Sequence, residues 1–184
     1  MTEKQKNQIE QRAIQRLNKT SRVELIKNIG AALIALNEQG WGQIRIVNLL
    51  DEVQNVWNET ARDEKRSLLM IMEEETGIEL KESESGKSYH EVDYLSGRAT
   101  PRTMTPAEYF YMQAQQRRWL GTLALASVFL SLYRLHDWGG TRLQRLVDRV
   151  NEIKAENKGN ATTIRRKCHD LTGVDIVQHL EIFN

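Results

Sequence analysis

Two stretches of this chain, residues 33–53 and 130–150, repeat one pattern, and no other feature constrains the fold as strongly. In each stretch an apolar segment leads to a Trp-Gly pair, and a second segment with apolar residues at helical spacing follows. Glycine at the end of such a pattern stops a helix, so each stretch predicts two helices joined by a Trp-Gly turn. We therefore expect two related helical hairpins in one pseudo-symmetric body. One offset of 97 residues superposes Trp41/Trp138, Gly42/Gly139, Arg45/Arg142, Ile46/Leu143, Leu49/Leu146, Leu50/Val147, Asp51/Asp148 and Val53/Val150.

The composition favours a mainly α-helical fold. The chain has 184 residues, of which 40% are hydrophobic, and its two prolines are Pro101 and Pro106. This length can bury a substantial core, and few prolines leave long segments able to form helices. The predicted fold is a helical bundle with two related helix–turn–helix units and a small β-hairpin or acidic loop between them.

Changes in pattern divide the chain into four segments. A polar helical arm is expected over 1–20, a first helical unit over 21–77, an acidic hairpin or loop over 78–104, and a second helical unit over 105–184, all in one compact domain. Ser21, with Glu24 three residues later, is typical of a helix start.

Local signals place the remaining helices. A third helix is predicted from Asp63 to Glu75, before Gly77, and Thr105-Pro106 is expected to open the longest helix of the chain. The last helix is expected to begin with Thr162 or Thr163 as its cap. The uncharged run at 119–133 is too short to span a bilayer, so it predicts a buried central helix.

Charge is strongly segregated along the chain. The net formal charge is +1 overall, but it is +4 over residues 1–50, −8 over 51–93 and +5 over 94–184. Such a distribution is expected if different faces meet different partners, or if the basic ends neutralise the acidic centre on folding. Both readings remain open at this level.

The acidic centre supplies the first candidate surface. A run of three glutamates lies near the end of a predicted helix, where the helix dipole disfavours negative charge. An acidic face of this kind is complementary to a basic nucleic-acid channel, although a solvated helix face is an equal alternative. The residues expected to bind a protein partner are Glu73, Glu74, Glu75, Glu79, Glu82 and Glu84.

The basic C-terminal part supplies the second candidate surface. If the second Trp-Gly unit is a DNA-binding helix–turn–helix, its second helix presents Arg142, Gln144, Arg145 and Arg149. The recurrence of Arg45 and Arg142 in a first helical turn suggests a specific acceptor, either an internal carboxylate or a phosphate or acidic partner. The residues expected to bind nucleic acid or an acidic partner are Arg142, Arg145, Arg149, Lys154, Arg165 and Arg166.

Signals for catalysis are weak. The four histidines show no metal-ligand spacing, and Glu79-Leu80-Lys81 lacks the preceding acidic strand of a metal-dependent nuclease. We therefore predict no enzyme activity, no cofactor and no metal. The single cysteine, Cys168, and the lack of a secretory or membrane-spanning pattern predict a cytoplasmic protein that does not bind membranes.

The block at 132–150, from Leu132-Tyr133-Arg134-Leu135-His136-Asp137-Trp138-Gly139 onward, resembles small early-region proteins of phages and prophages of Gram-positive bacteria. The first stretch and the segment from Trp57 to Leu80 are similar to them too, so the likeness covers about half of the chain. The resemblance implies a mobile-element protein that acts on nucleic-acid machinery, by binding DNA or by blocking a host enzyme as anti-CRISPR proteins do. It brings no catalytic residues.

These observations predict a non-enzymatic interaction protein that inhibits or redirects a nucleic-acid-handling host protein, such as a CRISPR effector nuclease. The alternative is a helix–turn–helix regulator of transcription or replication that binds DNA directly. Direct nucleic-acid binding and a homodimer both stay open.

Overall fold

The computed structural model describes residues 3–62, 67–78 and 106–181, and these residues form helices without any strand. The helices are α1 (Glu3–Glu38), α2 (Gln43–Arg62), α3 (Leu68–Thr76), α4 (Pro106–His136), α5 (Gly140–Glu156), α6 (Ala161–Thr172) and α7 (Ile176–His179). The mainly helical prediction is confirmed. From residue 79 onward, the predicted hairpin or loop at 78–104 lies outside the described residues.

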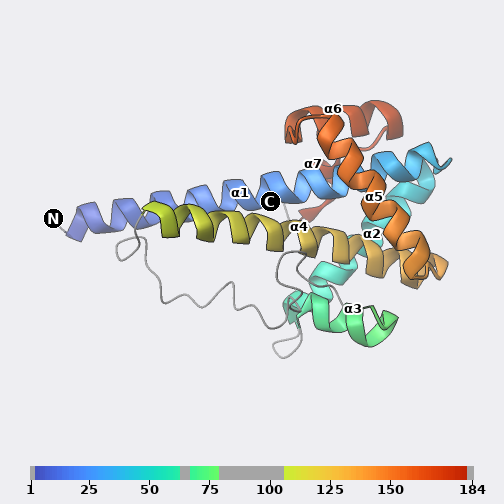
Figure 1. Cartoon of the computed structure of the whole chain (residues 1–184), viewed down its shortest axis with the longest axis horizontal. Helices are drawn as coiled ribbons and strands as arrows, with labels where there is room; N and C mark the ends of the chain where they lie inside the picture. The colour runs from blue at the N-terminus through green and yellow to red at the C-terminus, as the bar shows by residue number, and fades with distance from the viewer. Residues whose placement is uncertain (1–2, 63–66, 79–105, 182–184) are drawn as a thin grey trace.

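Two long helices form the axis of the molecule. In Figure 1, α1 and α4 run side by side and in the same direction, and the other helices gather around their C-terminal halves. Helices α5 and α6 pack on α1, whereas α2 and α3 pack on α4. Each long helix therefore supports the short helices that follow the other one, and all of them share one apolar core.

The core lies where α1 and α4 are buried on all sides. Residues 31–36 of α1 and 126–132 of α4 are buried, as the prediction of a buried central helix requires. Gly30 lets α6 approach α1 closely, because a Cβ atom at this position would lie 2.9 Å from Cγ2 of Ile164. No helix in the described part of the chain is long and apolar enough to cross a membrane.

Glycines end the helices where the sequence indicates. Gly40, Gly77 and Gly173 have φ angles of 87°, 67° and 72°, a left-handed conformation that glycine adopts without steric cost. Helix α4 instead ends at Asp137, with φ of 53°. Aspartate tolerates this region better than most residues, so the second turn forms without a glycine at that point.

Three predicted helix boundaries are wrong. Ser21 starts no helix, because α1 continues through it as one helix of 36 residues, longer than the 31 residues of α4. Helix α3 begins at Leu68, and the Ser67 side chain accepts a hydrogen bond from the backbone N–H of Met70. Asn160, not a threonine, caps α6 through the N–H of Thr163. A good capping residue is thus overridden when the chain on both sides stays helical.

Candidate partner-binding surfaces

The two Trp-Gly turns meet at one end of the bundle. The rings of Trp41 and Trp138 are buried and lie edge to face, with centroids 5.8 Å apart. The Arg45 guanidinium lies over the Trp41 ring at 4.3 Å, and that of Arg142 lies over the Trp138 ring at 5.9 Å. Both turns therefore have the same local arrangement, in which an arginine covers the tryptophan four residues before it.

This arrangement explains what the recurring arginines bind. Among the residues that the structure describes, no carboxylate lies within ion-pair distance of Arg45 or Arg142. Their acceptor is the negative face of an indole ring, an attraction that does not need a favourable helix dipole. The sequence contained the signal, because each tryptophan lies just before a helix and an arginine recurs four residues later, near the start of that helix.

His136 lies beside this junction. Its ring is edge-on to Trp41, with centroids 4.8 Å apart. Burial lowers the pKa of His136, and the positive charge of Arg45 lowers it further. The imidazole is therefore neutral at pH 7 and acts as part of the aromatic cluster.

The second feature is an arginine surrounded by three carboxylates. Arg134 of α4 bonds to Glu75 through Nε (2.9 Å) and Nη2 (2.5 Å), to Glu59 through Nη1 (2.8 Å) and to Glu52 through Nη1 (3.4 Å). These hydrogen bonds raise the pKa of Arg134. We call Glu52, Glu59, Glu73, Glu74 and Glu75 the acidic surface of α2 and α3. Arg134 joins three of these five glutamates, and the five glutamates together with Arg134 carry a formal charge of −4.

The predicted acidic residues lie in different environments. Glu75 pairs with Arg134, so an internal ion pair accounts for an acidic residue at the C-terminal end of α3, and no external partner is needed to explain it. Glu73 is half-buried and Glu74 is exposed on the same helix. Glu79, Glu82 and Glu84 lie outside the described residues. Sequence reasoning missed Glu52 and Glu59, although their spacing of seven on one helix placed them on a common face.

The predicted basic residues are mostly engaged within the protein. Arg149 donates to Glu38 through Nε (2.7 Å) and Nη2 (2.9 Å), and through Nη1 to Glu152 and Glu156 at 2.8 Å each. Its pKa is raised by these bonds, and the pKa of Glu38 is lowered in return. Arg149 is therefore an internal cross-link between α1 and α5.

Lys154 is half-buried and bonds within the protein. Its Nζ donates to Oδ1 of Asn28 at 3.0 Å, and Asn28, which is 3% exposed, donates through Nδ2 to the carbonyl oxygen of Glu24. Burial lowers the pKa of Lys154, and the nearby Lys27 lowers it further. This lysine joins α5 to α1 inside the bundle.

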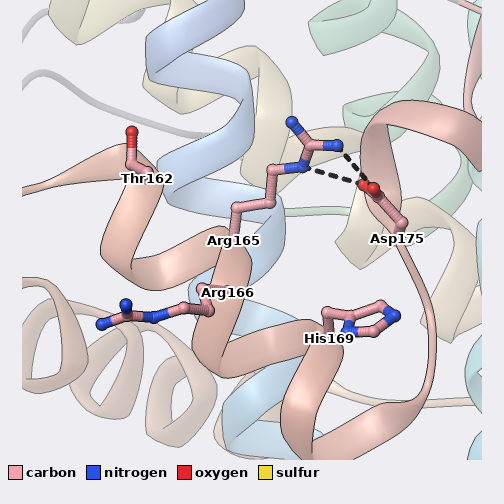
Figure 2. A pocket seen from close by; sticks show the side chains of 5 residues that line it. All are labelled: Thr162, Arg165, Arg166, His169 and Asp175. Atoms are coloured by element: carbon pink, nitrogen blue, oxygen red, sulfur yellow. Dashed lines mark hydrogen bonds and ion pairs between the residues drawn. The ribbon is translucent and has the colours of Figure 1, made fainter.

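Arg165 pairs with Asp175 at the edge of a pocket on α6. Arg165 donates to Asp175 through Nε (2.9 Å) and Nη2 (2.5 Å), and the pKa of Asp175 is lowered mainly by this pair. Figure 2 shows the two side chains together with Thr162, Arg166 and His169. Of the six predicted basic residues, the side chains of Arg142, Arg145 and Arg166 make no hydrogen bond or ion pair within the described part of the chain, and Arg142 lies over Trp138 instead.

The described side chains include one thiol, that of Cys168. It is buried against Thr172, and burial raises its pKa to about 11. A thiol with this pKa is protonated at neutral pH and is a poor nucleophile. Within residues 3–62, 67–78 and 106–181, no group of three His, Cys, Asp or Glu side chains could hold a metal ion.

Comparison with protein-family models, with curated proteins and with solved structures gives no match to this chain. Its function is therefore inferred from the arrangement of its own residues.

Proposed function

We propose that this chain is a non-enzymatic interaction protein that binds a nucleic-acid-handling protein through the acidic surface of α2 and α3, and inhibits or redirects it. An effector nuclease in the cytoplasm of a bacterial host is the kind of partner that fits. The observation that carries the proposal is the carboxylate cluster at Arg134, where Glu52, Glu59 and Glu75 converge on one cation.

The physical reason is charge complementarity. Nucleic-acid channels are lined by lysine and arginine, and a rigid surface with excess negative charge competes with the phosphate backbone for them. Arg134 holds three glutamates from two helices in fixed positions, which lowers the entropy lost when a partner binds.

The rival function is direct DNA binding by α5. In its favour, Arg142 and Arg145 are exposed at the start of the second helix of a helix–turn–helix. Against it, Arg149 and Lys154 on the same helix are committed to Glu38 and Asn28. Too few cations remain on this helix for the several phosphate contacts that DNA binding needs.

We also propose that the chain contains two copies of a three-helix unit, α1–α3 and α4–α6. Beyond the Trp-Gly turns, α3 and α6 end alike. Thr76 Oγ1 donates to the carbonyl of Met72 and accepts from the N–H of Ile78, and Thr172 does the same with Cys168 and Val174. On this view the shared residues build the fold, and function lies where the copies differ, as it does at the acidic surface.

The test is capture of a partner from a bacterial lysate, followed by measurement of the captured protein's DNA binding or cleavage with and without this chain. We expect the wild-type chain to retain a nucleic-acid-handling protein and to reduce its activity. Charge reversal by Glu73→Lys with Glu74→Lys leaves the three partners of Arg134 in place and is expected to abolish capture.

The matched control is Asp170→Lys, a charge reversal at an exposed position on α6. It is expected to leave capture unchanged. Equal capture by the two variants would overturn the role of the acidic surface. Tight binding of the chain itself to random duplex DNA, with a steep dependence on salt, would favour the rival.

A further inference from the structure

The outer side of α6 carries a pocket that the proposed function does not use. Its volume is about 290 Å³, and it is lined by Thr162, Arg165, Arg166, His169 and Asp175. Four of these residues follow one another at the spacing of a single helix face, and Asp175 reaches the pocket from the segment that leads to α7. Figure 2 shows Arg165 directed toward Asp175, with Arg166 and His169 extending to opposite sides.

Helix packing does not require these polar residues. The side of α6 that faces the core consists of Ile164, Cys168 and Thr172. Helix α3, which ends in the same threonine-glycine cap, has Met70 and Glu73 at the positions of Arg166 and His169, counted back from the capping glycine. The basic character of the pocket is therefore particular to α6.

The single carboxylate of the pocket is already occupied. Oδ1 of Asp175 accepts from Nε of Arg165 and from the backbone N–H of Val177, and Oδ2 accepts from Nη2 of Arg165. This pairing neutralises the aspartate and fixes the guanidinium plane, while Nη1 of Arg165 makes no hydrogen bond to any described residue. A guanidinium held in this way offers a preoriented donor at little further entropic cost.

The remaining lining groups are also donors. The Arg166 guanidinium makes no ion pair with a described residue, and Thr162 is exposed on the same helix. His169 is exposed too, with Nδ1 of its ring 3.8 Å from Oδ1 of Asp170. Thr162 lies in the first turn of α6, which contains no acidic residue. The positive end of the helix dipole therefore adds to the charge of Arg166. The set of spare donors and the unpaired cation suits an anion with several acceptor oxygens.

We propose that this pocket binds a phosphate group, either as a small phosphorylated molecule or as a phosphate of a nucleic-acid strand. Arg166 supplies the charge, Arg165 supplies a donor held in place by Asp175, and Thr162 lies on the same side of α6. The site is separate from the acidic surface of α2 and α3, so its failure would leave the proposed function untouched.

The test is a calorimetric titration of the full chain with inorganic phosphate, a nucleoside monophosphate and a short single-stranded oligonucleotide, at constant ionic strength. We expect saturable binding of phosphate that Arg166→Gln weakens about tenfold, because it removes a charge-assisted contact. The control Arg117→Gln removes an exposed arginine of α4 that does not line the pocket and is expected to leave this binding unchanged. Thermal unfolding of both variants should match the wild type.

The oligonucleotide and the monophosphate distinguish the source of the phosphate. Tighter binding of the oligonucleotide, lost in Arg166→Gln, would identify a nucleic-acid backbone as the ligand. Binding of the monophosphate but not of the oligonucleotide would identify a small phosphorylated molecule. No saturable binding of any of the three, or equal weakening in Arg117→Gln, would overturn the proposal.

Discussion

Trp41 and Trp138, which are 97 positions apart in the sequence, meet edge to face with ring centroids 5.8 Å apart. Each ring closes a turn between two helices, and each is covered by the arginine four residues after it. This single contact joins the α1–α2 turn to the α4–α5 turn. The end of the bundle therefore depends on a pair of residues that neither turn could bury alone.

The tryptophan pair should couple energetically. We expect Trp41→Ala and Trp138→Ala each to lower the free energy of unfolding by about 3–5 kcal/mol, as large-to-small core substitutions do. In the double variant the total loss should be smaller than the sum of the two single losses by about 0.5–1.5 kcal/mol, which is the coupling energy of an aromatic pair. Urea unfolding of the four proteins measures this, and strict additivity would show that the ring contact contributes nothing.

His136 should report on Arg45. The charge of Arg45 contributes to the lowered pKa of His136, so Arg45→Gln should raise that pKa toward the ordinary value of about 6.5. Arg142→Gln, which uncovers the other tryptophan, should leave it unchanged. The measurement is an NMR pH titration of the His136 ring.

The same shift predicts a pH dependence of stability. In the unfolded chain His136 takes up a proton near its ordinary pKa, whereas in the folded protein the lowered pKa delays protonation. The unfolded state thus binds more protons below a pH of about 6.5, and the free energy of unfolding falls as the pH drops through that window. Arg45→Gln should reduce this fall.

Acid should also break the internal ion pairs. The pKa values of Glu38 and Asp175 are lowered in the folded protein by Arg149 and Arg165. Their contribution is fully present above the ordinary carboxyl pKa values and is lost as the pH falls through the lowered ones. Arg149→Gln should lower the free energy of unfolding by at most about 1 kcal/mol at neutral pH, because the pair is partly exposed. It should also make the free energy of unfolding fall less steeply at acid pH. An unchanged acid profile in this variant would contradict the assignment.

Arg134 should matter more than the exposed arginines. Arg134→Gln removes the cation that joins Glu52, Glu59 and Glu75, so we expect a loss of about 1–2 kcal/mol in the free energy of unfolding. The matched variant Arg145→Gln should stay within about 0.5 kcal/mol of the wild type. Raising the salt concentration should reduce the difference in the free energy of unfolding between the two variants, since salt screens the repulsion among the glutamates.

Some of the candidate site was within reach of local reasoning. Arg45 and Arg142 follow their tryptophans at i+4, and Glu52 and Glu59 share one face of α2. The bonding partners of Arg149 and Lys154 could not be predicted from local sequence. Their partners Glu38 and Asn28 lie 111 and 126 residues away, and no local pattern links such positions.

The sequence by itself determined the helical character of the chain, the turns at the two Trp-Gly pairs, and the helix ends at Gly40, Gly77 and Gly173. These features depend on side-chain periodicity and on backbone conformations open to glycine, which act over a few residues. Only the tertiary structure decided that α1 continues through Ser21, that α5 and α6 pack on α1, and that Arg149, Lys154 and Arg165 are bonded internally. Those outcomes depend on burial and charge pairing between distant segments, and such energies exist only once the helices are packed together.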